Sequence, residues 1–131
     1  MKRIIVFMSA ILLIVCTGCF KDEDYKSTEF FLKNNCDQTI EVTSSAWVRY
    51  FDDQFVEETL VDYVSSGETL SMRKMNLVED FSMNTVFSKI EIRMGNQLSP
   101  IDALNRDNWV KTLTSDSKVE YTLTVDESFF K

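Results

Sequence analysis

The stretch V-E-Y-T-L-T-V-D at residues 119–126 decides the fold class. Apolar side chains stand at every second position, at Val119, Tyr121, Leu123 and Val125, and the positions between them are polar. Because successive side chains of a strand point to opposite faces, this period of two predicts a β-strand with one buried side and one side facing water. Half-buried strands of this kind are typical of antiparallel sheets.

The same alternation recurs in the preceding part of the chain. It is present at residues 40–43 and 89–94, and further strand candidates lie between turn-forming residues at 28–33, 46–51, 55–64, 68–77 and 108–114. Turn residues, rich in Asn, Asp, Ser and Gly, stand at 34–37, 65–67 and 95–96. Many short strands at this spacing predict a single all-β domain over residues 28–131, an antiparallel two-sheet sandwich of immunoglobulin-like or fibronectin-like kind.

One short helical turn is predicted at residues 99–105, S-P-I-D-A-L-N. Ser99 is a good N-cap, Pro100 fits the first helical position, and Asp102 can bond back to the cap. The segment 75–84 fits a loop as well as a strand.

Residues 1–18 have the layout of a secretion signal. Lys2 and Arg3 form a positive start, residues 4–16 form an uncharged apolar run, and the small pair Thr17 and Gly18 follows. A helix that spans a membrane needs about 20 apolar residues, so this run is too short for a comfortable permanent span.

The sequence V-C-T-G-C-F at residues 15–20 resembles the lipobox of bacterial lipoproteins, in which a small residue precedes an invariant cysteine. Gly18 and Cys19 match that pattern, whereas Cys16 occupies a position where leucine is usual. The resemblance implies cleavage after Gly18, acylation of Cys19 and attachment to a membrane. Several acyl chains make such an anchor durable, because one chain alone binds a bilayer only marginally.

An acidic run follows the proposed anchor directly and consists of Lys21, Asp22, Glu23 and Asp24. It is similar to the surface-export signal of lipoproteins from Bacteroidota, which implies a lipid-anchored protein of the outer membrane, displayed at the cell surface. The alternatives are an ordinary solvated linker and an orientation toward the periplasm. Residues 19–27 are expected to form an acidic polar tether.

The charge balance and the missing histidine exclude several functions. The chain has 14 basic and 21 acidic residues and no histidine, and removal of Lys2 and Arg3 makes it more acidic still. Such a protein is repelled by phosphate backbones, so nucleic acid is not expected as a partner. Without histidine, neither Ser/His nor Cys/His nucleophile pairs can form. We therefore expect no enzymatic activity, no cofactor and no metal, with a carboxylate-based hydrolase as a remote alternative.

Two groups of residues have both a chemical and a structural interpretation. Cys36 is left without an intramolecular disulfide partner if Cys19 is acylated, and it is either a reactive thiol or a small buried hydrophobe. The carboxylates at 52–53 and 57–58 can line a calcium site or form the solvated rim of a hairpin.

Aromatic residues are the remaining candidates for binding. They gather at Trp47, Tyr50, Phe51, Phe55, Tyr63 and Trp109. Exposed rings stack on sugars or anchor protein partners, whereas rings from strand interiors fill a core. We select Tyr50, Trp47 and Trp109 as candidate contacts for a glycan or protein ligand. The function predicted from the sequence is a surface-displayed binding or adhesion-type module, with a periplasm-facing accessory or inhibitory subunit of an envelope complex as the alternative.

Overall fold

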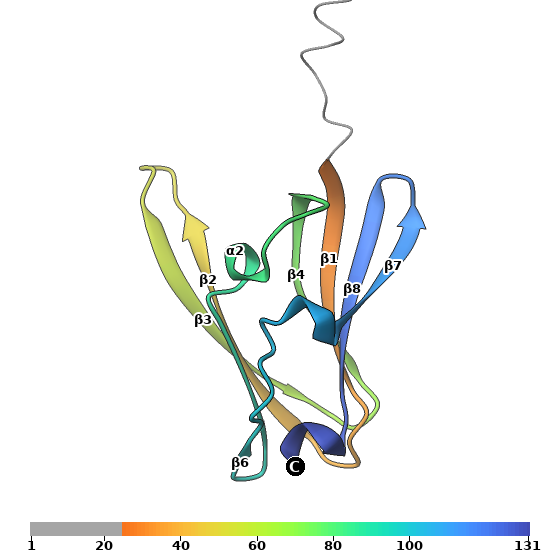
Figure 1. Cartoon of the computed structure of the whole chain (residues 1–131). Helices are drawn as coiled ribbons and strands as arrows, with labels where there is room; N and C mark the ends of the chain where they lie inside the picture. Colours follow the sequence, from red (N-terminus) through yellow and green to blue (C-terminus); the bar gives the residue numbers. More distant parts are fainter. Residues whose placement is uncertain (1–24) are drawn as a thin grey trace, which may run out of the picture.

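The protein is described by a computed structural model in which residues 25–131 form two four-stranded sheets packed as a sandwich (Figure 1). The predicted two-sheet sandwich is confirmed. The signal sequence at 1–18, the acylated Cys19 and the acidic run Lys21 to Asp24 lie outside the described residues.

Each sheet combines strands from distant parts of the chain. The first sheet has the order β4-β1-β8-β7, with β1 at Tyr25–Asn34, β4 at Thr69–Val78, β7 at Trp109–Ser115 and β8 at Lys118–Val125. The second sheet has the order β3-β2-β5-β6, with β2 at Ile40–Arg49, β3 at Phe55–Val64, β5 at Lys89–Met94 and β6 at Gln97–Leu98.

Neighbouring strands are antiparallel, with one exception. β1 pairs in parallel with β8 from Ser27 to Asn34, and its other side pairs antiparallel with β4. β1 begins at Tyr25, inside the segment 19–27 that was expected to be tether. The reason is that β4 pairs with Tyr25 and Lys26 on one side and β8 pairs from Ser27 onward on the other, so ladder pairing holds these first residues in extended conformation.

β2 also differs from the sequence prediction. The separate candidates at 40–43 and 46–51 form one strand that ends at Arg49. Ser44 and Ser45 continue the pairing because their partners Leu60 and Thr59 on β3 remain in register, and the hydroxyls of Ser45 and Thr59 lie 2.8 Å apart within hydrogen-bonding distance.

Two short helices lie between strands, and a third follows the last strand. α2 covers Met83–Val86, and two 3-10 helices cover Arg106–Asn108 (η2) and Glu127–Phe130 (η3). The helical turn predicted at residues 99–105 is wrong. The Ser99 hydroxyl accepts the N–H of Ile101, and the Asp102 carboxylate accepts the N–H of Leu104, so these side chains stabilise local turns that compete with a helix.

The core lies between the sheets and is built on aromatic rings. Phe30 of β1 is fully buried, and its ring centroid lies 5.6–5.8 Å from those of four other rings, which belong to Phe81, Phe87, Trp109 and Tyr121. All four apolar residues of the 119–126 stretch are buried, as predicted. The rings of Phe81, Phe87 and Trp109 meet Phe30 edge to face and that of Tyr121 is stacked on it, and such aromatic pairs add about 0.5–1.5 kcal/mol each beyond the burial of area.

The two sheets diverge toward one end of the molecule. In Figure 1 they lie close together near the C-terminus and spread apart toward the tips of the β2–β3 and β7–β8 hairpins, with α2 between them. The outer half of the β2–β3 hairpin therefore extends away from the opposite sheet.

Candidate binding surface

The β2–β3 hairpin presents most of the exposed apolar surface in the second sheet. β3 is an edge strand that pairs with β2 without a register shift, from Phe55 opposite Arg49 to Val64 opposite Ile40. Eight of its ten residues are exposed. A strand with this many apolar residues is normally covered, so its exposure marks a candidate interaction surface.

The outer face of the hairpin, which points away from the opposite sheet, carries an aromatic and aliphatic group. Ile40, Val42 and Val64 belong to the core, and residues of the opposite parity therefore face outward. Trp47, Phe55, Val61 and Tyr63 share this outer face and are each more than half exposed. These four residues are called the outer patch below.

The inner face of the hairpin is also open where the sheets diverge. A groove of about 140 Å³ lies there between the hairpin and the neighbouring parts of the chain. The hairpin lines one side of the groove, and β4 and the end of α2 line the other. The lining residues are Ser44, Ala46, Val48, Glu58 and Leu60 of the hairpin, Met72 and Arg73 of β4, and Phe87 directly after α2. The hairpin thus offers apolar surface on both faces.

Polar contacts fix the turn of the hairpin. Asp53 adopts a left-handed backbone with φ 59°, and its carboxylate accepts hydrogen bonds from the Arg49 guanidinium. The Tyr50 hydroxyl contacts the Glu58 carboxylate, and this contact raises the pKa of Tyr50. Phe51 lies between Tyr50 and Asp53 in the turn and is fully exposed.

The carboxylates of this region do not converge on one point. Glu57 and Glu58 point to opposite faces of β3, and Asp53 is engaged by Arg49. Within residues 25–131, no group of three or more acidic or cysteine side chains converges in a way that could hold a metal ion. Here the solvated hairpin rim is the interpretation that the geometry supports.

Two of the three binding candidates selected from the sequence lie on the hairpin, and the third does not. Trp47 and Tyr50 are about half exposed. Trp109 is wrong as a surface contact, because it is buried and its indole N–H donates to the Ala103 carbonyl at 2.8 Å. Its ring also stacks on Phe87, with centroids 6.3 Å apart.

Sequence reasoning did not select the aliphatic part of the surface. Val56, Leu60 and Val61 are 44–59% exposed. A signal was present in the stretch F-V-E-E-T-L-V-D-Y-V at residues 55–64, which is apolar without strict alternation. Such a stretch indicates either a strand buried on both faces or a strand with two accessible faces.

Cys36 is a buried hydrophobe in this structure. Its side chain is 2% exposed and its sulfur lies 3.7 Å from the Val125 carbonyl. Burial raises the pKa of the Cys36 thiol, and the carboxylates of Glu127, Asp126 and Asp37 raise it further. Because the thiolate is the reactive form, the folded protein protects this cysteine.

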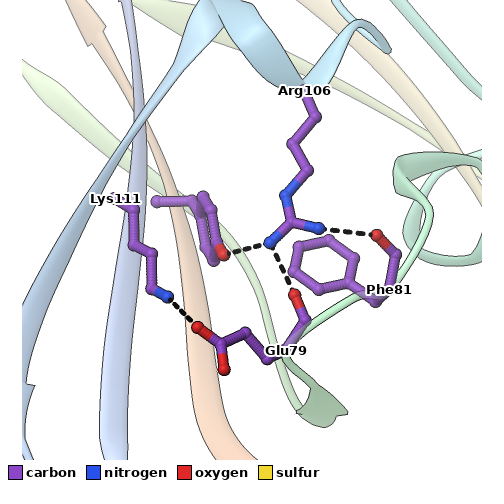
Figure 2. A network of polar contacts seen from close by, with 5 residues as sticks. Glu79, Phe81, Arg106 and Lys111 are labelled. Atoms are coloured by element: carbon purple, nitrogen blue, oxygen red, sulfur yellow. Dashed lines mark hydrogen bonds and ion pairs between the residues drawn. The ribbon is translucent and has the colours of Figure 1, made fainter.

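A second polar cluster surrounds Arg106 and has a structural role (Figure 2). The Arg106 guanidinium donates to the carbonyls of Phe81 and Glu79 at 2.9 and 2.7 Å and to the Tyr121 hydroxyl at 2.7 Å. It also lies 4.3 Å from the centroid of the Phe81 ring. These contacts hold the segment after β4 against η2 and β8.

Lys111 of β7 extends the same cluster at the surface. Its ammonium lies 3.1 Å from the Glu79 carboxylate, and this contact lowers the pKa of Glu79 (Figure 2). The protein itself supplies partners to both terminal nitrogens of Arg106 and to the Lys111 ammonium, so the geometry of this cluster gives no indication of a substrate site.

Comparison with protein-family models, with curated proteins and with solved structures finds no match to this chain. Among residues 25–131, no helix is both long and apolar enough to cross a membrane.

Proposed function

We propose that the chain is a non-enzymatic binding module and that the β2–β3 hairpin is its contact surface. The observation that carries the proposal is the exposure of eight of the ten residues of β3, with apolar side chains on both faces. Solvent-exposed apolar patches of this kind mark interaction sites with other proteins or ligands. Aromatic residues such as those of the outer patch are enriched at the centres of such sites.

The proposal includes a membrane anchor at Cys19 and display at the cell surface. It is supported by the lipobox-like sequence around Gly18 and Cys19 and by the acidic run that starts at Lys21. Mass spectrometry of the mature N-terminus tests the anchor, and we expect an acylated Cys19. A free thiol at that residue, or a retained Met1, contradicts it. Protease treatment of intact cells tests display, and a protein left uncut while a surface control is removed contradicts surface exposure.

Site-specific photo-crosslinking tests the contact surface. A photo-reactive amino acid placed at Val61 on the outer patch is expected to form an adduct with the partner in the cells that make the protein. Val110 of β7 is the matched control, because it is also an exposed valine on an edge strand, at 63% exposure against 52% for Val61.

The crosslinking result decides between the outcomes. Adducts at Val61 and none at Val110 support the hairpin as the contact surface. An absence of adducts at Val61, or equal labelling at both positions, contradicts it. Identification of the adduct as an envelope protein assigns the accessory role, and identification as an extracellular protein or glycan assigns adhesion.

A further inference from the structure

The edge strands of the two sheets differ in how they are protected against pairing with another strand. Natural sheets protect their edges by short strands, bulges, proline and charged side chains, most often lysine. β6 has only two residues. β4 has a register shift opposite Phe30 and Phe31 and carries Arg73 and Lys74. β7 has a register shift between Leu113 and Ser115 and carries Lys111.

β3 is neither short nor bulged and has no proline, and its charged side chains are carboxylates rather than lysines. It runs for ten residues without lysine, proline or glycine, and its register with β2 is continuous. In an antiparallel pair, alternate residues direct their N–H and C=O groups away from the partner strand. In the part of the chain that the structure describes, β3 pairs only with β2. A full row of backbone donors and acceptors is therefore available along its free side.

The charges of β3 select among strands that could pair there. The strand carries Glu57, Glu58 and Asp62 and no basic residue. Two copies paired through β3 would bring six carboxylates into one two-stranded ribbon, and like charges across a ladder are destabilising. A strand with lysine or arginine would instead be attracted. The carboxylates thus act against self-association and favour a cationic partner.

We propose that β3 binds an extended, basic segment of a partner protein as an added strand of the second sheet. This inference rests on the proposed function, because it names the binding mode and the partner chemistry of the same hairpin. The main-chain groups of β3 supply the hydrogen bonds, as in other cases of strand addition. Glu58 and Asp62 contact cations on the inner face, whereas Phe55, Val61 and Tyr63 contact apolar side chains on the outer face.

A designed peptide tests the binding mode directly. The probe is a ten-residue peptide of alternating lysine and valine, which places its cations on one face and its apolar side chains on the other. The full chain in detergent is titrated with the labelled peptide, and binding is measured by fluorescence anisotropy. Hydrogen exchange of the β3 amides is measured in parallel, and we expect the amides on the free side to exchange more slowly when the peptide is bound.

Two altered peptides separate the contributions. A version with glutamate in place of lysine should bind at least about tenfold more weakly, because attraction becomes repulsion at each cation. A version N-methylated throughout the backbone keeps its charge but cannot donate hydrogen bonds, and it should not protect the β3 amides. Equal binding of either version overturns the proposal, since the charge preference or the strand pairing would then be absent.

Variants of the protein complete the test. Glu58→Lys combined with Asp62→Lys should weaken binding of the lysine peptide by at least about tenfold, because each ion pair near the surface contributes about 0.2–1 kcal/mol and its reversal adds repulsion. Asp107→Lys combined with Asp116→Lys is the matched control, since it makes the same change in net charge at two exposed residues outside the second sheet, and it should leave binding unchanged. All four residues are near or at the surface, so both double variants should fold.

The outcomes distinguish this inference from the proposed function. If Val61 forms its adduct but the lysine peptide does not bind, the hairpin remains the contact surface and strand addition is wrong. If protection of the β3 amides increases with protein concentration in the absence of peptide, a second copy is the occupant and the basic partner is wrong. If Val61 forms no adduct, the proposed function is contradicted.

Discussion

Replacement of Arg106 by methionine tests whether the cluster of Figure 2 stabilises the fold. The change removes hydrogen bonds to the carbonyls of Phe81 and Glu79 and to the Tyr121 hydroxyl. The bond to Glu79 is exposed to water and contributes little. The other two are partly buried and contribute about 1 kcal/mol each, and the contact of the guanidinium with the Phe81 ring adds about 1 kcal/mol.

The expected loss is therefore about 3 kcal/mol in the free energy of unfolding. In a domain of about 100 residues, each kcal/mol corresponds to roughly 4–8 °C in Tm, so the midpoint should fall by at least about 12 °C. Urea and thermal unfolding followed by circular dichroism measure both quantities. Methionine keeps most of the aliphatic stem, and the loss therefore reports on the guanidinium.

Two further variants control this result. Arg106→Lys should recover less than about half of the loss, because a single ammonium cannot reproduce the planar fork of the guanidinium. Arg49→Met removes an arginine whose side chain is 63% exposed and should change stability by less than about 0.5 kcal/mol. A loss of less than about 1 kcal/mol for Arg106→Met would refute the structural role of the cluster.

Three other changes probe the turns and the buried thiol. Asn34→Leu removes three hydrogen bonds of a fully buried amide and should lower the free energy of unfolding by about 3 kcal/mol in urea titrations; a loss below about 1 kcal/mol would contradict this. Gly95→Ala places a Cβ at φ 61° and should cost about 1 kcal/mol, and unchanged stability would show that the turn relaxes freely. Cys36 should react with iodoacetamide at pH 8 only when the protein unfolds, and fast labelling of the folded protein would refute its burial. Because folding raises the pKa of Cys36, the un-ionised thiol contributes fully to the free energy of unfolding below the unfolded pKa of about 8.5. This contribution is lost as the pH rises further toward the folded pKa, and Cys36→Ala should abolish that pH dependence.

Local periodicity predicted the strands that have one buried face. The alternation at 119–126 identified β8 and its buried residues, and the glycines at 67 and 95 do adopt left-handed turns. The parallel pairing of β1 with β8 was not predicted, because strand order is a property of the whole chain and leaves no mark in either strand alone. For the same reason the sequence alone did not show that β3 is an edge strand.

The aromatic residues show where single-sequence reasoning stops. Trp47 and Trp109 both occur within predicted strands, yet one is exposed and the other is buried. Their positions differ because Trp109 begins β7 beside Phe30 in the core, whereas Trp47 lies on the outer face of a hairpin that diverges from the opposite sheet. Local sequence places an aromatic residue within a strand. Whether its side chain is buried or exposed depends on how strands from distant parts of the chain pack together.

The central position of β1 has a mechanical consequence if the chain is held to a membrane through Cys19. A pulling force that enters at Tyr25 runs along β1, which is bonded to β4 on one side and to β8 on the other. Bonds that lie across the direction of pull are strained together rather than opened one after another. A module that binds a moving partner through its hairpin would thus transmit tension to the bilayer through a strand that is hydrogen-bonded on both sides.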